Sequence, residues 1–133
     1  MKNNPMNILY LPLNRKWYRL IRSGEKTAEY REIKPYWIKR ICCLANRKKI
    51  DDGFLRGLAA VQESCAEAFE RGAIVPKAYT HVKFTYGYTK RSMTFEIKGI
   101  GIGRGRPEWG APEGDVFVIS LGNRIDNIST EKL

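Results

Sequence analysis

Histidine and cysteine are scarce in this chain, which limits the chemistry that it can carry. Its 133 residues include one histidine, His81, and three cysteines, of which Cys42 and Cys43 are adjacent and Cys65 stands apart. A single histidine excludes a histidine-based metal site and leaves a Ser-His-Asp triad without support. The cysteine spacing fits neither a zinc site nor a disulfide framework. We therefore expect no metal, no cofactor, and reduced thiols in or near the core, with a reactive thiol as the alternative.

Long apolar segments are absent as well. No run approaches the ~20 residues that a membrane-spanning helix needs, and the apolar segment 8–13 is too short for the centre of a signal peptide. We expect a cytoplasmic protein without a membrane partner. The chain has no internal repeat and no low-complexity linker, and its length fits one domain with one core. The prediction is a single domain over residues 1–133 that ends in a polar tail at residues 123–133.

Carboxylates are scarce in the first part of the chain. Residues 1–50 contain 13 lysines and arginines against 3 aspartates and glutamates, whereas residues 51–133 contain 11 of each kind. The whole net charge of +10 therefore lies in the first 50 residues. A field of this size attracts polyanions through counterion release, which favours nucleic acid over a neutral metabolite as the ligand. A basic surface that serves only solubility is the alternative.

The residue pattern predicts a basic helix over residues 15–23, followed by a short strand. Asn14 is expected to cap the helix, and Gly24 to end it in the left-handed conformation. The helix is expected to bury Trp17, Leu20 and Ile21. It also carries a separate cationic stripe of Arg15, Arg19 and Arg22. From Lys26 the period changes to two, which places Thr27, Glu29 and Arg31 on one face of the strand.

Lys26 lies where this helix passes into the strand, and it is the first candidate for a functional residue. Its ammonium can clamp a phosphate or, if burial lowers its pKa, act as a general base, although many lysines in such turns are merely solvated. Glu29 and Arg31 can form an ion pair that is structural or that reads a base edge. Thr27 offers a hydroxyl that can bind a phosphate or act as a nucleophile. We expect Lys26, Glu29 and Arg31 to share one cleft.

The remaining elements are predicted from periodicity. A short helix is expected at residues 36–41, near Pro35, and the longest helical pattern covers residues 54–71. The longer segment is acidic and amphipathic, and we interpret it as a helical insertion near residues 51–72 that can pack on the domain or dock a protein partner. Strands are expected at residues 8–11, 27–31, 81–86, 92–102 and 116–121, with a hairpin at residues 87–91. These strands suffice for a small barrel.

Several side chains outside the strand could support nucleic-acid binding. Tyr18 and Tyr36 can stack on an exposed base, and Lys39 and Arg40 extend the positive surface. No helical pattern follows the glycine-rich residues 99–110, so they are not a dinucleotide-binding loop. We interpret them as a strand that another backbone or a ligand approaches closely, followed by a loop over the cleft. This loop supplies two phosphate-competent donors, a carboxylate and an indole ring: Arg104, Arg106, Glu108 and Trp109.

The spacing of Gly24, Lys26, Glu29 and Arg31 resembles the G-x-K-x-x-E-x-R signature of the ASCH domain, a small β-barrel related to the PUA domain. Residues 8–13 with the helix after them, residues 32–40 and residues 100–112 also resemble one subgroup of this family. The resemblance covers most of the chain except residues 44–76 and the last ten or so. It implies an α+β fold built on a PUA-like barrel of about five strands with flanking helices. It also implies recognition of RNA or a modified nucleotide in a cleft centred on Lys26, Glu29 and Arg31.

Two other functions stay open. Some ASCH relatives are hydrolases, including ribonucleases and an amidohydrolase that acts on acetylated cytidine with a lysine, a threonine and a glutamate. Lys26 matches that lysine, but Glu29 stands at the position of the threonine. A metal-independent hydrolase that uses Lys26, Glu29 and Thr27 is therefore one alternative. An adaptor that docks a protein through residues 54–71 is the other.

Overall fold

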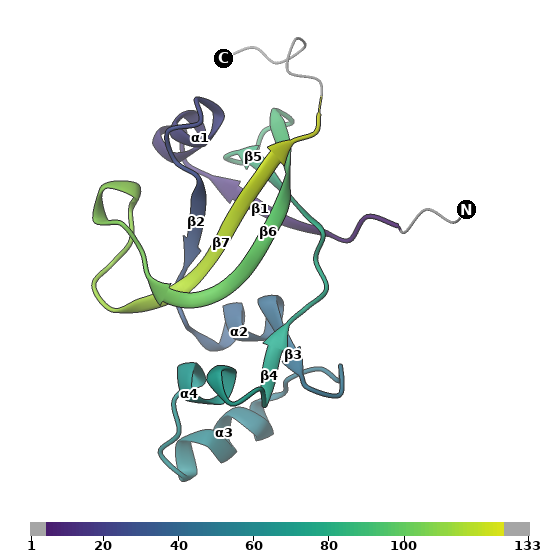
Figure 1. The fold of residues 1–133 in the computed structure, drawn as a ribbon, viewed down its shortest axis with the longest axis vertical. Coiled ribbons are helices and arrows are strands. Elements are labelled where there is room, and N and C mark those ends of the chain that lie inside the picture. Colours follow the sequence, from purple (N-terminus) through teal and green to yellow (C-terminus); the bar gives the residue numbers. More distant parts are fainter. Residues whose placement is uncertain (1–4, 127–133) are drawn as a thin grey trace. The chain divides into compact units, whose positions relative to one another are not determined.

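The computed structural model describes residues 5–126 and has the α+β class expected from the sequence (Figure 1). The strands are β1 (Ile8–Leu13), β2 (Ala28–Arg31), β3 (Cys42–Leu44), β4 (Ile74–Pro76), β5 (His81–Tyr86), β6 (Ser92–Arg104) and β7 (Asp115–Arg124). The helices are α1 (Arg15–Arg22), α2 (Pro35–Ile41), α3 (Asp52–Ala60) and α4 (Cys65–Glu70), with one 3₁₀ turn, η1 (Pro107–Trp109). No helix within residues 5–126 is long and apolar enough to cross a membrane.

The main sheet contains the five strands that the sequence predicts, in the order β1-β5-β6-β7-β2. It is mixed, because β1 runs parallel to β5, with Ile8 opposite His81 and Leu13 opposite Tyr86, whereas β5 and β6 are antiparallel. The expected hairpin at residues 87–91 is confirmed, since it joins β5 to β6.

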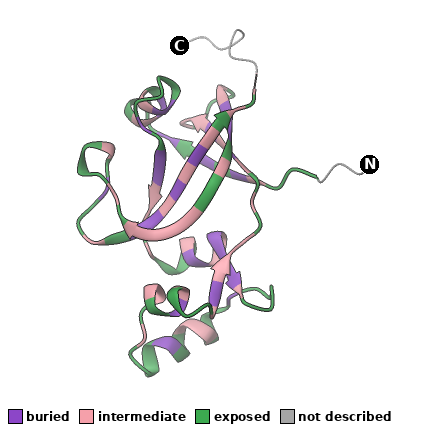
Figure 2. Ribbon diagram, in the orientation of Figure 1, coloured by how far each residue is buried: buried purple, intermediate pink, exposed green. Residues whose placement is uncertain are grey.

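The chain divides into two compact units. The first unit comprises residues 5–29, 78–100 and 119–126, and the second comprises residues 30–77 and 101–118. The core of the first unit is built from strand alternation: every second residue of β1 is buried, namely Leu9, Leu11 and Leu13 (Figure 2). Phe84 of β5 packs at 6.0 Å from Phe95 of β6, measured between ring centroids. This apolar face is the surface on which α1 packs its buried side.

Helix α1 has the ends that the sequence predicts. The Asn14 side-chain oxygen accepts the backbone N–H of Trp17 at 3.1 Å, and Gly24 follows the helix with a φ of 85°. Helix α1 buries Tyr18 and Ile21, while Trp17 and Leu20 are half-buried. The predicted inward face is therefore shifted by one residue, towards Tyr18.

The second unit has its own small core. Strands β3 and β4, which the sequence analysis did not predict, form an antiparallel pair. Cys42 and Cys43 are buried, Cys65 is half-buried, and all three are free thiols, as expected. Burial raises the pKa of Cys42 to about 12 and that of Cys65 to about 11, which disfavours the reactive thiolate.

The single long helix predicted over residues 54–71 is wrong. The chain forms α3 and α4 instead, and Gln62 between them has a φ of 58°, which no α-helix accommodates. Ser64 starts α4 with a capping box, because its hydroxyl accepts the Glu67 backbone N–H at 3.0 Å and the Glu67 carboxylate accepts the Ser64 N–H at 2.9 Å. Val61, which follows the last residue of α3, is 70% exposed. At the other end of the chain, β7 continues to Arg124, so part of the expected tail is strand, and residues 127–133 lie outside the described residues.

Candidate nucleic-acid interface

The predicted centre of the site, Lys26 with Glu29, forms a buried ion pair. The Lys26 ammonium lies 2.8 Å from the Glu29 carboxylate and donates a second hydrogen bond to the Ala28 carbonyl at 2.5 Å. The two side chains are 0% and 5% exposed, respectively. The Lys26 backbone N–H donates to the Leu20 carbonyl at 3.0 Å, which fixes the chain where it leaves α1. The ammonium also lies 5.7 Å from the centre of the Trp17 ring.

This geometry gives the pair a structural role. Charges removed from water are tolerated when they are paired and hydrogen-bonded, and both conditions hold for Lys26. The pair ties the start of β2 to the end of α1. Thr27, by contrast, is exposed, and its backbone carbonyl accepts the N–H of Leu121 at 3.1 Å. Thr27 is therefore open to solvent, while Lys26 and Glu29 are buried.

In the second unit, Arg31 borders a depression of about 310 Å³. Its guanidinium lies 5.0 Å from the centre of the Trp37 ring and donates to the Tyr30 carbonyl at 3.3 Å. The depression contains one arginine, one carboxylate and the end of the glycine-rich loop. Its lining residues are Tyr30, Arg31, Glu32, Gly110, Pro112 and Val116.

The glycine-rich loop folds against Tyr30. The Arg106 backbone N–H donates to the Tyr30 hydroxyl at 3.1 Å. A Cβ atom on Gly105 would lie 2.5 Å from the Ala111 Cβ and 2.8 Å from the Tyr30 ring, so only glycine fits there. At Gly105 the close contacts are protein side chains, whereas a Cβ atom on the strand residues Gly99, Gly101 or Gly103 would meet no atom within 4 Å, so the close approach predicted along the strand is not found there. Arg104 and Arg106 are exposed. The Arg106 guanidinium lies 4.6 Å from the centre of the Trp109 ring and 4.0 Å from the Glu108 carboxylate.

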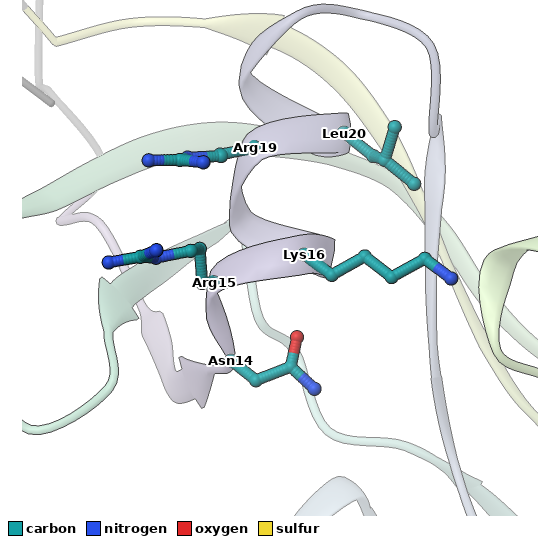
Figure 3. A pocket seen from close by; sticks show the side chains of 5 residues that line it. All are labelled: Asn14, Arg15, Lys16, Arg19 and Leu20. Atoms are coloured by element: carbon teal, nitrogen blue, oxygen red, sulfur yellow. The ribbon is translucent and has the colours of Figure 1, made fainter.

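The cationic stripe predicted on α1 is present and exposed. Arg15, Lys16, Arg19 and Arg22 are all exposed, and within residues 5–126 none of them forms an ion pair with a carboxylate. Arg15 and Arg19 extend side by side from one side of the helix, one turn apart, while Lys16 and Leu20 project from the other (Figure 3). With Asn14 they line a shallow depression of about 560 Å³. We call the stripe of Arg15, Arg19 and Arg22 the α1 face.

The β5–β6 hairpin adjoins the α1 face through Arg15, and the sequence analysis did not single out its side chains. The Arg15 Nε donates to the Tyr86 hydroxyl at 2.5 Å. The Arg91 guanidinium lies 5.1 Å from the centre of the same tyrosine ring. A third depression, of about 520 Å³, lies here, lined by Arg15, Tyr86, Thr89 and Arg91. The available signal was the density of tyrosine, lysine and arginine in residues 86–91.

Of the other side chains predicted to contact nucleic acid, some are exposed and others are buried or paired within the protein. Tyr18 is 0% exposed and stacks on Tyr86 with ring centroids 5.2 Å apart, so the prediction that it stacks on a base is corrected: it is a core residue. Tyr36 is exposed, with its ring edge-on to Trp37, and its hydroxyl accepts from Arg40 at 3.4 Å. Lys39 forms an ion pair with the Asp52 carboxylate of α3. The hydrogen bond that the Lys39 ammonium donates to this carboxylate lowers the pKa of Asp52.

Among the described residues no cluster of metal ligands points to another kind of site, and the comparisons with known proteins do not point to one either. Within the described part of the chain, no three histidine, cysteine, aspartate or glutamate side chains are close enough to hold a metal ion together. The His81 Nδ1 lies 2.7 Å from the Thr80 hydroxyl. Comparison with protein-family models, with curated proteins and with solved structures finds no match.

Proposed function

We propose that the protein binds RNA, or a modified nucleotide within RNA, and that the α1 face contacts the phosphates. The observation that carries this proposal is the exposure of four cationic side chains on an eight-residue helix, with no carboxylate in that helix. Like charges on adjacent turns destabilise an isolated helix, so the arrangement has a cost that a polyanion would remove. Arginine suits this role, since its planar guanidinium forms bidentate hydrogen bonds to phosphate.

The proposal includes an ASCH-type, PUA-like fold and a cytoplasmic location. The signature spacing and the five-stranded mixed sheet support the fold. In this reading, Lys26 and Glu29 hold the start of β2 in place. Arg31 and the depression beside it are the candidate pocket for a base or nucleotide, with Tyr36, Arg40, Arg104 and Arg106 as further contacts in the second unit. No comparable observation favours the hydrolase, because the Lys26 ammonium is already paired with Glu29. None favours the adaptor either, because Asp52 of α3 already forms an ion pair with Lys39.

Fluorescence anisotropy with labelled RNA oligonucleotides, in EDTA and over a series of salt concentrations, tests the proposal. Each phosphate contact to a single strand contributes about 0.7 to the slope of log K against log salt. The double variant Arg19→Gln/Arg22→Gln should therefore lower the slope by about 1.4 and weaken binding. The matched control, Arg56→Gln/Lys98→Gln, removes the same charge from exposed positions outside the α1 face and should leave the slope unchanged. Absence of RNA binding by the wild type, or an equal loss in the control, would contradict the proposal.

A further inference from the structure

The β5–β6 hairpin presents an aromatic ring to solvent. Tyr88 is 98% exposed, the highest exposure among the large hydrophobic residues of the described chain. The turn that carries it is held by its own hydrogen bonds: the Tyr86 N–H donates to the Arg91 carbonyl at 2.9 Å, and the Thr89 hydroxyl donates to the Tyr86 carbonyl at 2.6 Å. Gly87 supplies the positive φ of 56° that the turn requires. The ring is thus exposed on an ordered turn.

Cationic groups accompany this ring. Lys90, two residues further along the chain, is exposed, and the Arg91 guanidinium lies over the Tyr86 ring. No carboxylate occurs in residues 86–91. The Tyr86 hydroxyl is bonded to Arg15, so the hairpin and the α1 face share one cationic surface. A positive surface with an exposed aromatic ring is the combination that single-stranded nucleic acids recognise, because phosphates and unpaired bases can be bound together.

We propose that Tyr88 stacks on an unpaired base, and that the surface formed by the α1 face and this hairpin therefore prefers single-stranded RNA to duplex RNA. This inference rests on the proposed function, since the phosphates must be held by the cationic side chains. In a duplex both faces of each base are covered by its neighbours, so Tyr88 has no base to stack on. In a single strand the base is free to leave the stack, and every base offers a π-face, so the contact needs no particular sequence.

The test compares single-stranded and duplex RNA of equal length by fluorescence anisotropy with wild type, Tyr88→Ala and Tyr88→Phe. Stacking of one base on one ring is lost in Tyr88→Ala, so affinity for the single strand should fall roughly 5- to 100-fold. Affinity for the duplex and the salt slope should not change. Tyr88→Phe keeps the ring and should keep the affinity. Tyr10→Ala, another exposed tyrosine of the first unit, is the matched control and should bind as the wild type does.

The outcomes separate this inference from the proposed function. If the wild type binds RNA with a steep salt slope but Tyr88→Ala binds the single strand as tightly as before, the stacking inference is wrong and the proposed function stands. Equal affinity for single-stranded and duplex RNA would also overturn it. If the wild type binds neither single-stranded nor duplex RNA but binds vesicles of phosphatidylserine, the stacking inference and the proposed function are both wrong, and the cationic surface binds an acidic membrane. Because Tyr88 is almost fully exposed, its replacement is not expected to impair folding.

Discussion

Breaking the ion pair between Lys26 and Glu29 should destabilise the protein severely. Their side chains are 0% and 5% exposed, so neither charge can be rehydrated when its partner is removed. Replacing one partner of such a buried pair costs about 3–5 kcal/mol. Lys26→Met leaves a buried carboxylate, and Glu29→Gln leaves a buried ammonium that retains its hydrogen bond to the Ala28 carbonyl. Each single variant should therefore lose a large part of the ~5–15 kcal/mol that stabilises a typical domain.

The double variant Lys26→Met/Glu29→Gln distinguishes an ion pair from two independent packing effects. Because it leaves no net charge buried, it should be more stable than the sum of the single effects predicts, by about 2–3 kcal/mol. The free energy of unfolding is measured by urea denaturation for all four proteins of the cycle. Arg71→Met/Glu63→Gln, at the more exposed ion pair of Glu63 and Arg71, is the control and should lose far less. Additive single effects, or single losses below about 1 kcal/mol, would refute the reasoning.

Three further predictions concern packing and titration. Gly105→Ala should cost about 1–3 kcal/mol because its Cβ would overlap protein atoms, whereas Gly103→Ala, with open space around it, should cost less in the same urea assay. The two thiols with raised pKa should react slowly with iodoacetamide near about pH 8.5 and quickly once urea unfolds the protein; equal rates would contradict their burial. Burial raises the pKa of Asp126, but hydrogen bonds from Arg124 and the Thr94 N–H outweigh it, so the net pKa is lowered. The contribution of ionised Asp126 to the free energy of unfolding should thus be present above about pH 3.9 and lost as the pH falls through its lower pKa in the folded protein. Asp126→Asn should remove this part of the pH dependence of stability.

Local signals in the sequence were sufficient for much of the fold. Asn14 and Gly24 mark the ends of α1 because capping and positive φ depend on the residue itself. The limits of β5 were predicted correctly from alternation. Strands β3 and β4 were missed because three-residue strands carry almost no periodicity and depend on pairing with a distant segment. The parallel pairing of β1 with β5 is likewise a property of the whole chain.

The helical pattern of residues 54–71 failed for a different reason. Leu58 and Ala68 are both buried, so apolar spacing continues across a break in the helix. The break was nevertheless encoded, since Ser64 and Glu67 form the S-x-x-E capping signature. For the candidate site, the charge pattern of the sequence predicted the exposed cationic stripe of α1 correctly. The same pattern could not indicate that the Lys26 side chain is buried. The side chains of the hairpin were not predicted as contacts, because turn residues such as those at 87–91 indicate a local conformation and not a binding role.

The order of strands in the main sheet has a consequence for synthesis on the ribosome. The two strands at its edges, β1 and β2, precede the three central strands β5, β6 and β7 in the chain. A nascent chain therefore emerges with both edge strands unpaired and cannot pair β1 before residues 81–86 have been translated. Such long-range pairing slows folding and leaves strand edges open to association with other chains. The polar and basic residues that follow β1 would limit this association while translation continues, because like charges keep nascent chains apart.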